Sequence, residues 1–314
     1  MRSAPRDVAA STPAGQPVRA RIVAAFGRNF LADAGSGEAL PCVARGKRSE
    51  VVCGDKVLLL PGDPALIQSV LPRRNTLWRE DAWRSKVFAA NLDLLLVVTA
   101  AEPSPHLDLV GRALIAASAE DIEAAVVLNK CELPGTAALR RRLQPLVDCG
   151  YPLLEVSARS APQQTVDVLH GWLRGRTCML IGASGVGKST LANALIPGLQ
   201  AQTGELSEAL GSGRHTTTST RLWAVPGLPA GSALLDSPGF QAFGLNQLSV
   251  TQLQHALPEL RARNGRCRFQ NCSHRQEPGC VVRDAVQAGE IDAERYALYL
   301  RVLQELLDAP RHTG

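Results

Sequence analysis

The segment Gly182–Thr190 has the residue types and the spacing of a phosphate-binding loop, because it fits the pattern G-x-x-x-x-G-K-[ST]. Glycines let the backbone curl so that successive N–H groups point at phosphate oxygens. The Lys188 side chain can reach β- and γ-phosphates, and the Ser189 hydroxyl can ligate Mg²⁺. The predicted nucleoside triphosphate site therefore contains Gly182, Ala183, Ser184, Gly185, Val186, Gly187, Lys188, Ser189 and Thr190.

A second motif indicates which base is bound. The residues Asn129, Lys130, Cys131 and Glu132 follow a short apolar run and resemble the base-reading motif N-K-x-D of GTPases. In that motif the carboxylate accepts hydrogen bonds from the ring N–H and the exocyclic amine of guanine, a pair of donors that adenine lacks. Glu132 keeps the charge of the usual aspartate but is one methylene longer, so its reach toward guanine differs. We expect Asn129, Lys130 and Glu132 to bind the base.

Two polar segments have the composition to contact the γ-phosphate and its Mg²⁺ ion. Asp236 and Gly239 form a D-x-x-G motif after an apolar run. We expect the Asp236 carboxylate to hold Mg²⁺ through water and the Gly239 N–H to sense the γ-phosphate. The glycine-flanked segment 213–218 contains three successive threonines. Either Thr216 or Thr217 would close over Mg²⁺, and we favour Thr217.

The order of these motifs along the chain is unusual. In an ordinary GTPase the phosphate-binding loop comes first and the base-reading loops come last. Here the base-reading motif and the pair Ser157 and Ala158, which we expect to pack on the guanine, precede the loop at 182–190. A folded domain often tolerates joining its old termini and opening new ones. We therefore predict a circularly permuted GTPase, in which the γ-phosphate signal runs toward a C-terminal module.

That C-terminal module has a metal-binding pattern. Cys267, Cys272, His274 and Cys280 form C-x4-C-x-H-x5-C, and three thiolates with one imidazole match a closed, four-coordinate structural zinc site. The segment contains few large apolar residues, so one Zn²⁺ ion would supply folding energy, and we expect a core separate from that of the nucleotide domain. Disulfides or free thiols are the alternatives, and the lack of a secretory signal favours a reducing compartment. Buried or idle thiols are expected at Cys42, Cys53, Cys131 and Cys149.

Strands and helices must position these motifs. An apolar run at 178–181 and a helical pattern from Leu191 give the strand–loop–helix context that a phosphate-binding loop requires. Between residues 18 and 70, short alternating runs separated by turn signals are typical of a small barrel such as an OB-fold. Basic residues on this barrel suit either RNA binding or a solvated face. We interpret Arg79, Trp83 and Arg84 as part of a linker.

Length and composition are consistent with several domains. The chain has 314 residues, 45% of them hydrophobic, and a net charge of +5. No apolar run approaches the roughly 20 residues of a membrane span, so no membrane is expected. The charge permits an anionic partner without requiring one. The predicted division is a disordered tail at 1–16, an OB-fold barrel at 17–72, the GTPase domain at 73–248 and the zinc-binding domain at 249–314.

Together these parts resemble the RsgA (YjeQ) family of bacterial ribosome-assembly GTPases over about residues 17–308. The most specific parts are Gly213–Thr218, Asp236–Phe240 and the zinc spacing. The resemblance implies a circularly permuted α/β P-loop GTPase domain with an N-terminal all-β OB-fold barrel and a C-terminal, mostly helical zinc module. It implies GTP hydrolysis, with Mg²⁺, in late maturation of the small (30S) ribosomal subunit. The protein would bind that subunit and its 16S rRNA in the GTP form and leave on hydrolysis. We expect a cytoplasmic monomer.

Hydrolysis requires a group that orients water. Many GTPases place a glutamine directly after D-x-x-G, but this chain has Phe240 there, with Gln241 one residue late. His215 is the candidate catalytic residue, and the resemblance points to it as well; the alternative is a histidine that contacts only RNA or solvent.

Two rival functional classes stand beside this GTPase interpretation. One is a small-molecule kinase, which would lack the guanine motif. The other is a zinc-containing RNA-binding protein in which GTP is structural or regulatory.

Overall fold

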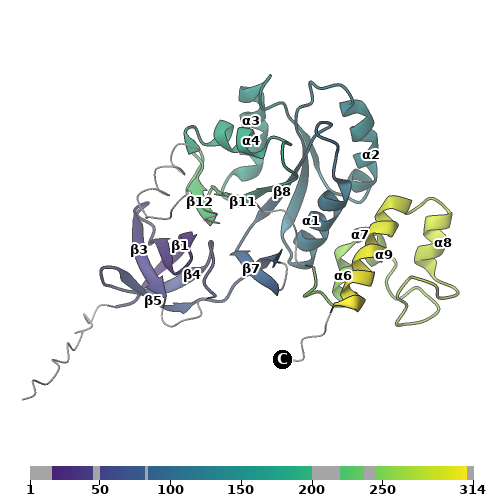
Figure 1. The fold of residues 1–314 in the computed structure, drawn as a ribbon, viewed down its shortest axis with the longest axis horizontal. Helices are drawn as coiled ribbons and strands as arrows, with labels where there is room; N and C mark the ends of the chain where they lie inside the picture. The colour runs from purple at the N-terminus through teal and green to yellow at the C-terminus, as the bar shows by residue number, and fades with distance from the viewer. Residues whose placement is uncertain (1–15, 45–49, 82–83, 200–219, 237–244, 310–314) are drawn as a thin grey trace, which may run out of the picture.

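The computed structural model describes residues 16–44, 50–81, 84–199, 220–236 and 245–309. These residues form three units in a row: a β-barrel at one end, a sheet with helices in the middle, and a helical module at the other end (Figure 1). Within the described residues, no helix combines the length and the apolar character that a membrane span needs.

The N-terminal unit is a closed barrel of five strands. Their order is β1-β2-β3-β5-β4, and β1 also pairs with β4, which closes the barrel. Alternate side chains point inward, as the alternating apolar runs predicted, and Ile22, Phe30 and Val57 lie in its core. The expected OB-type barrel is confirmed. The strands are β1 (Val18–Phe26), β2 (Asn29–Asp33), β3 (Ala39–Ala44), β4 (Lys56–Leu60) and β5 (Ala65–Val70).

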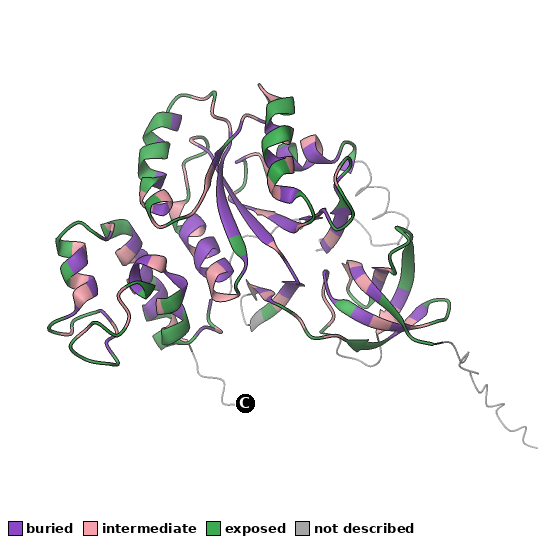
Figure 2. Ribbon diagram, turned by 180° about the vertical axis from the view of Figure 1, so that it is seen from behind, coloured by how far each residue is buried: buried purple, intermediate pink, exposed green. Residues whose placement is uncertain are grey.

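The middle unit is a sheet whose order is β10-β9-β8-β11-β13-β12. The first five strands are parallel, and β12 is antiparallel to β13. Strands buried on both faces must be apolar throughout, and every residue of β8 is buried (Figure 2). The strands are β8 (Leu94–Thr99), β9 (Glu123–Leu128), β10 (Leu153–Glu155), β11 (Thr177–Ile181), β12 (Thr220–Ala224) and β13 (Ala233–Asp236).

Two pairs of helices cover this sheet. Residues of α1 and α2 pack in one apolar core, and residues of α3 and α4 pack in a second. The bounds are α1 (Leu107–Ala119), α2 (Thr136–Asp148), α3 (Pro162–Leu173) and α4 (Lys188–Leu195). Because the base-reading loop follows β9 and the phosphate-binding loop follows β11, the motifs meet at the carboxyl edge of the sheet despite their unusual order. The circular permutation predicted from the motif order is confirmed.

The barrel and the middle unit share one continuous sheet of 11 strands. Strand β1 of the barrel pairs with β12, with Ala24 opposite Arg221 and Ala25 opposite Thr220. The sequence did not predict this pairing, because the two strands are almost 200 residues apart along the chain.

The linker interpretation of Arg79, Trp83 and Arg84 was wrong. The chain forms a hairpin of β6 (Thr76–Asp81) and β7 (Arg84–Ala90), which pair antiparallel; Trp83 lies outside the described residues. Leu77 and Phe88 from the two strands are buried, so the hairpin belongs to the core of the middle unit rather than to a solvated connection.

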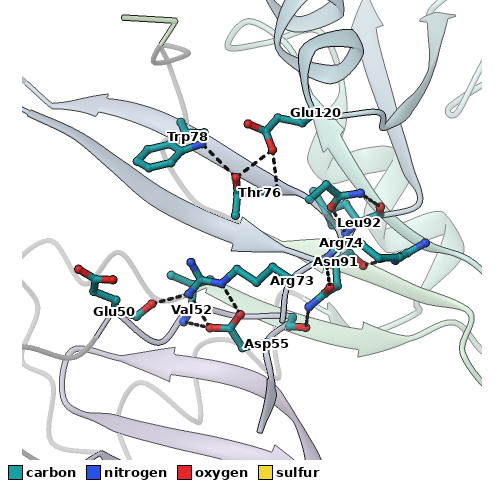
Figure 3. A network of polar contacts seen from close by, with 12 residues as sticks. Glu50, Val52, Asp55, Arg73, Arg74, Thr76, Trp78, Asn91, Leu92 and Glu120 are labelled. Carbon is teal, nitrogen blue, oxygen red and sulfur yellow. Dashed lines mark hydrogen bonds and ion pairs between the residues drawn. The ribbon is translucent and has the colours of Figure 1, made fainter. Parts of the chain in front are cut away.

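A network of polar contacts ties the barrel to the middle unit near this hairpin (Figure 3). The Asp55 carboxylate is fully buried and pairs with Arg73 at 2.7 Å. The neighbouring Arg74 donates from its backbone to Asn91 Oδ1 at 2.9 Å, and Asn91 Nδ2 donates to the Gly54 carbonyl at 3.0 Å. Buried polar groups are stable only when paired, so these contacts fix the connection between the two units.

The C-terminal unit consists of α6 (Val250–Ala256), α7 (Pro258–Arg261), α8 (Val281–Gln287) and α9 (Ala293–Asp308). The expectation of a separate core was wrong, since Leu253 and Tyr299 belong to the same apolar cluster as α1 and α2. A Cβ atom on Gly111 of α1 would come within 2.2 Å of Leu298 Cδ2, so the glycine allows α9 to approach closely. The two units therefore pack as one body.

A buried ion pair lies at this contact. Arg295 of α9 pairs with Glu259 of α7 at 2.8 Å, and both side chains are 7% exposed. The Cys149 thiol, which follows α2, contacts the other Glu259 oxygen at 3.5 Å. Burial raises the pKa of Cys149 to about 11, so this thiol stays protonated and can donate. Glu259 thus joins the two units.

We predict that Arg295→Met destabilises the C-terminal unit. It would leave the Glu259 carboxylate buried without its cation, which typically costs about 3–5 kcal/mol of the free energy of unfolding. Arg301→Met on the same helix is the control, because its partner Asp108 and Arg301 itself are about half exposed, and such pairs contribute at most about 1 kcal/mol. Chemical denaturation measures both. Equal losses in the two variants would contradict the prediction.

Candidate functional site

A cavity of about 560 Å³ opens at the carboxyl edge of the middle sheet. Three loops line this cavity: the base-reading loop after β9, the loop after β10 and the phosphate-binding loop after β11. Its volume and polar lining suit a nucleotide. The lining residues are Glu102, Asn129, Lys130, Glu132, Leu133, Ala158, Arg159, Ser184, Gly185, Gly187, Lys188, Ser189 and Thr190.

Glycine is required at both ends of the phosphate-binding loop. A Cβ on Gly182 would lie 2.1 Å from the Val98 carbonyl oxygen of β8, so only glycine allows the loop to leave β11 so close to the neighbouring strand. Gly187 has φ of +101°, and its Cβ would lie 2.2 Å from Asn129 Nδ2. Helix α4 begins at the next residue, Lys188, so its free N–H groups and dipole face the cavity.

The Lys188 ammonium lies inside the loop. Its Nζ donates to the carbonyls of Gly182 at 2.8 Å and Ala183 at 2.7 Å, and burial lowers its pKa. These two carbonyls hold the cation where phosphate oxygens would compete for it. A half-buried ammonium attracts such oxygens more strongly than one in water does.

Asn129 connects the base-reading loop to both other loops. Its side chain is almost fully buried; Nδ2 donates to the Val186 carbonyl at 3.0 Å, and Oδ1 accepts from the Ala158 N–H at 3.2 Å. Lys130 has φ of +60°, and its Nζ donates to the Glu102 carbonyl at 3.0 Å across the mouth of the cavity. The predicted base-binding residues are therefore brought together with the phosphate-binding loop.

Of the predicted nucleotide residues not yet placed, Ser157 and Asp236 lie on segments next to those that line this cavity. Ser157 lies in the loop after β10, where its N–H donates to Thr165 Oγ1 at 3.2 Å, although it does not line the cavity. Asp236 is the last residue of β13, beside the phosphate-binding strand. The predicted residues His215, Thr217 and Gly239 lie outside the described residues.

Three lining residues were missed by the sequence analysis. Glu102 follows β8, Leu133 follows the base-reading motif, and Arg159 follows Ser157 and Ala158. Each lies after a strand that the motifs already identified, at the edge where ligands bind in open α/β sheets. Position relative to the strand ends was therefore the signal that could have identified them.

The predicted metal ligands form a compact cluster. One ligand atom each from Cys267, Cys272, His274 and Cys280 lies within 4.8 Å of the others. The Cys267 and Cys280 sulfurs are 4.0 Å apart, and His274 Nδ1 is 3.6 and 3.4 Å from them. Tetrahedral zinc bonds of about 2.3 Å to sulfur and 2.0 Å to nitrogen would separate such ligands by about 3.5–3.8 Å. The cluster can hold a metal ion.

Neighbouring helices fix the backbone of this cluster. Tyr296 and Tyr299 of α9 donate hydroxyl hydrogen bonds of 2.6 Å to the carbonyls of His274 and Ser273. Gln254 of α6 donates to the Cys272 carbonyl at 2.9 Å. Burial lowers the pKa of His274, which favours the neutral imidazole that binds metal. The cluster therefore has the supporting hydrogen bonds that orient metal ligands.

Comparisons with known proteins agree with this architecture. Residues 70–246 match the family model described as RsgA GTPase. The chain is 50% identical over 287 residues to the small ribosomal subunit biogenesis GTPase RsgA of Bordetella pertussis, covering 90% of this chain and 95% of that protein. It is 46% identical over 304 residues to the protein of the same name from Paraburkholderia phymatum, covering 96% and 95%.

Two solved structures have the same fold. YjeQ from Thermotoga maritima superposes with a TM-score of 0.71 at 28% identity, covering 94% of this chain and all of that one. YloQ, described as a circularly permuted GTPase, gives a TM-score of 0.69 at 23% identity, covering 97% of this chain. With the family model, the relatives and the geometry in agreement, this chain belongs to the RsgA family of circularly permuted GTPases.

Proposed function

We propose that this protein hydrolyses GTP to GDP and phosphate during late maturation of the small ribosomal subunit. It binds the subunit and its 16S rRNA in the GTP form, as a monomer in the cytoplasm, and leaves after hydrolysis. The observation that carries this proposal is the cavity in which Asn129 joins a guanine-type loop to a phosphate-binding loop. A small-molecule kinase would have no use for the guanine-type loop. We propose that the protein's functional units are residues 17–72, 73–248 and 249–314.

Within the cavity each group has a separate role. Asn129 and Glu132 read the base, while Lys188 and the N–H groups at the start of α4 bind phosphate oxygens. A Mg²⁺ ion bound with GTP would be held by Ser189 and Thr217, with Asp236 acting through water, and would neutralise the phosphates. His215 orients the attacking water, and the Gly239 N–H senses the γ-phosphate. The Cys267, Cys272, His274 and Cys280 cluster holds one structural zinc ion.

Hydrolysis and subunit binding test this function together. Wild-type protein should cosediment with small subunits in the presence of a non-hydrolysable GTP analogue and should dissociate with GDP. Its GTP turnover should rise when subunits are added. Binding that ignores the nucleotide, without turnover, would instead support a zinc-containing RNA-binding protein in which GTP is structural.

Lys188→Ala should strongly reduce nucleotide binding or GTP hydrolysis. It removes the charge that Gly182 and Ala183 now hold at the phosphate end of the cavity. One electrostatic group that stabilises a transition state contributes on the order of 10²–10³-fold to turnover. Lys56→Ala on the exposed face of β4 is the control. Nucleotide binding and single-turnover hydrolysis measure the effect, and near-normal turnover in Lys188→Ala would refute the assignment.

His215→Ala should slow hydrolysis more than it weakens GTP binding, because a water-orienting group acts mainly in the transition state. Such a side chain typically contributes on the order of 10²–10⁴-fold. The variant should also remain on the small subunit longer, since release follows hydrolysis. His106→Ala, an exposed histidine before α1, is the control. If subunit-stimulated turnover is unchanged, or if GTP affinity falls equally, His215 is not the catalytic residue.

Purified protein should contain about one tightly bound zinc ion per chain. Cys272→Ser should lose that ion and expose residues 260–285 to protease, because metal binding supplies the folding energy of this segment. Cys42→Ser, in the barrel, should keep the ion. Metal analysis that finds no zinc in freshly purified wild-type protein would contradict the assignment.

A further inference from the structure

The backbone of His274 has an unusual conformation for a metal ligand. Its φ is +58°, in the left-handed region, which residues other than glycine adopt rarely and at an energetic cost. The side chain is nevertheless buried, and its Nδ1 lies 3.6 and 3.4 Å from the sulfurs of Cys267 and Cys280. A strained backbone persists only where its surroundings hold it. Contacts with neighbouring groups must therefore keep His274 in this conformation.

The carboxylate of Glu277 makes such contacts. Its Oε1 accepts hydrogen bonds of 2.6 Å from both the N–H and the hydroxyl of Ser273. Its Oε2 accepts from the N–H of Arg275 at 2.9 Å and from that of Gln276 at 3.0 Å. Hydrogen bonds to an ionised carboxylate are stronger than those between neutral groups. Because Ser273 and Arg275 flank His274, a single side chain holds the chain on both sides of this ligand.

Helix α9 holds the carbonyl groups of the same segment. Tyr299 donates to the Ser273 carbonyl and Tyr296 to the His274 carbonyl, each at 2.6 Å. The two tyrosines fix the carbonyl groups of this segment, whereas Glu277 fixes its N–H groups. Loss of the Glu277 carboxylate would leave the first set of contacts in place and release the second. The contribution of Glu277 can therefore be separated from that of the packed helix.

Glu277 does not act as a metal ligand in this geometry. The four ligand atoms that lie within 4.8 Å of one another come from Cys267, Cys272, His274 and Cys280. Both carboxylate oxygens of Glu277 already accept from backbone N–H groups. Three thiolates and one imidazole also complete the four positions of a structural zinc site. The carboxylate can therefore influence the metal only through the backbone that it holds.

We propose that Glu277 is a positioning residue of the metal site. Its carboxylate keeps the backbone of His274 in the left-handed conformation and so directs the imidazole toward the cysteine sulfurs. The inference rests on the proposed zinc site and adds a residue outside the pattern C-x4-C-x-H-x5-C. Groups that orient metal ligands through hydrogen bonds typically contribute about 10–100-fold to metal affinity.

Zinc affinity of the full-length protein tests this role. Glutamine at position 277 would offer one acceptor oxygen and one NH₂ group, so it could serve only one end of the turn. Glu277→Gln should therefore weaken Zn²⁺ binding about 10–100-fold, as measured by competition with a chromophoric chelator. Glu294→Gln is the matched control, because the Glu294 side chain is 72% exposed on α9. Its zinc affinity should equal that of wild type.

A double-mutant cycle separates positioning of His274 from general support of the loop. Zinc affinity is measured for His274→Ala alone and for His274→Ala combined with Glu277→Gln. If Glu277 acts through His274, the glutamine should weaken binding less than twofold once the imidazole is absent. Co²⁺ bound in place of Zn²⁺ provides a second measurement, because its visible absorption depends on the ligand set. The Co²⁺ spectrum of Glu277→Gln should shift toward that of His274→Ala.

Three results would count against the inference. Unchanged zinc affinity in Glu277→Gln would overturn it. Equal losses from Glu277→Gln with and without His274, together with a wild-type Co²⁺ spectrum, would show that the carboxylate supports the loop as a whole, and would overturn it as well. Wild-type protein that binds neither Zn²⁺ nor Co²⁺ would overturn the proposed zinc site together with the role of Glu277.

Discussion

The buried side chain of Asn129 is the contact on which the nucleotide site depends. Its amide donates to the Val186 carbonyl and accepts from the Ala158 N–H, and no other side chain among the described residues makes hydrogen bonds to both loops. The three loops come from chain positions near 130, 158 and 186, so local sequence cannot hold them together. Unpaired buried amide groups are costly, so the two bonds that satisfy Asn129 also fix the distance between the base end and the phosphate end. Gly187 completes the arrangement, because a side chain there would displace the amide.

The same sheet explains how the flanking units relate to the site. The chain between β11 and β12 contains His215 and the threonines expected to close over Mg²⁺, and β12, which follows them, pairs with β1 of the barrel. The segment 237–244, which follows Asp236, leads toward α6, which packs on α1 and belongs to the C-terminal unit. Each of the two segments expected to contact the γ-phosphate and Mg²⁺ is therefore followed along the chain by an element that contacts or belongs to a flanking unit. Circular permutation makes the second connection possible, because D-x-x-G no longer runs into the middle of the domain.

Short-range patterns predicted the chemistry, and long-range contacts escaped prediction. The phosphate-binding loop, the guanine-type motif and the Cys3His spacing are local, and each was recognised from residue types at fixed intervals. The barrel was predicted because period-2 alternation reports which face of a strand is buried. The β1–β12 pairing and the shared core of α1, α2 and α9 have no local signature. Arg79 and Arg84 suggested a linker because their charge is visible in the sequence, whereas the burial of Leu77 and Phe88 in the two hairpin strands depends on contacts with distant segments.

The shared core changes how the metal cluster contributes to the molecule. The cysteine-rich loop has few apolar residues of its own, yet Tyr296 and Tyr299 of α9 donate to its carbonyls. The same helix contacts α1, since Leu298 packs against Gly111 and Glu305 pairs with Arg112 at 2.6 Å. A metal ion that orders the loop would fix the carbonyls to which Tyr296 and Tyr299 donate. It would thereby also fix the position of α9 against α1. Free energy from metal binding would then stabilise the contact with the nucleotide domain as well as the loop itself. The metal cluster is far along the chain from the base-reading loop. In space, helix α9 contacts the cluster and also packs in the same core as α1 and α2, the helices on either side of that loop in the chain.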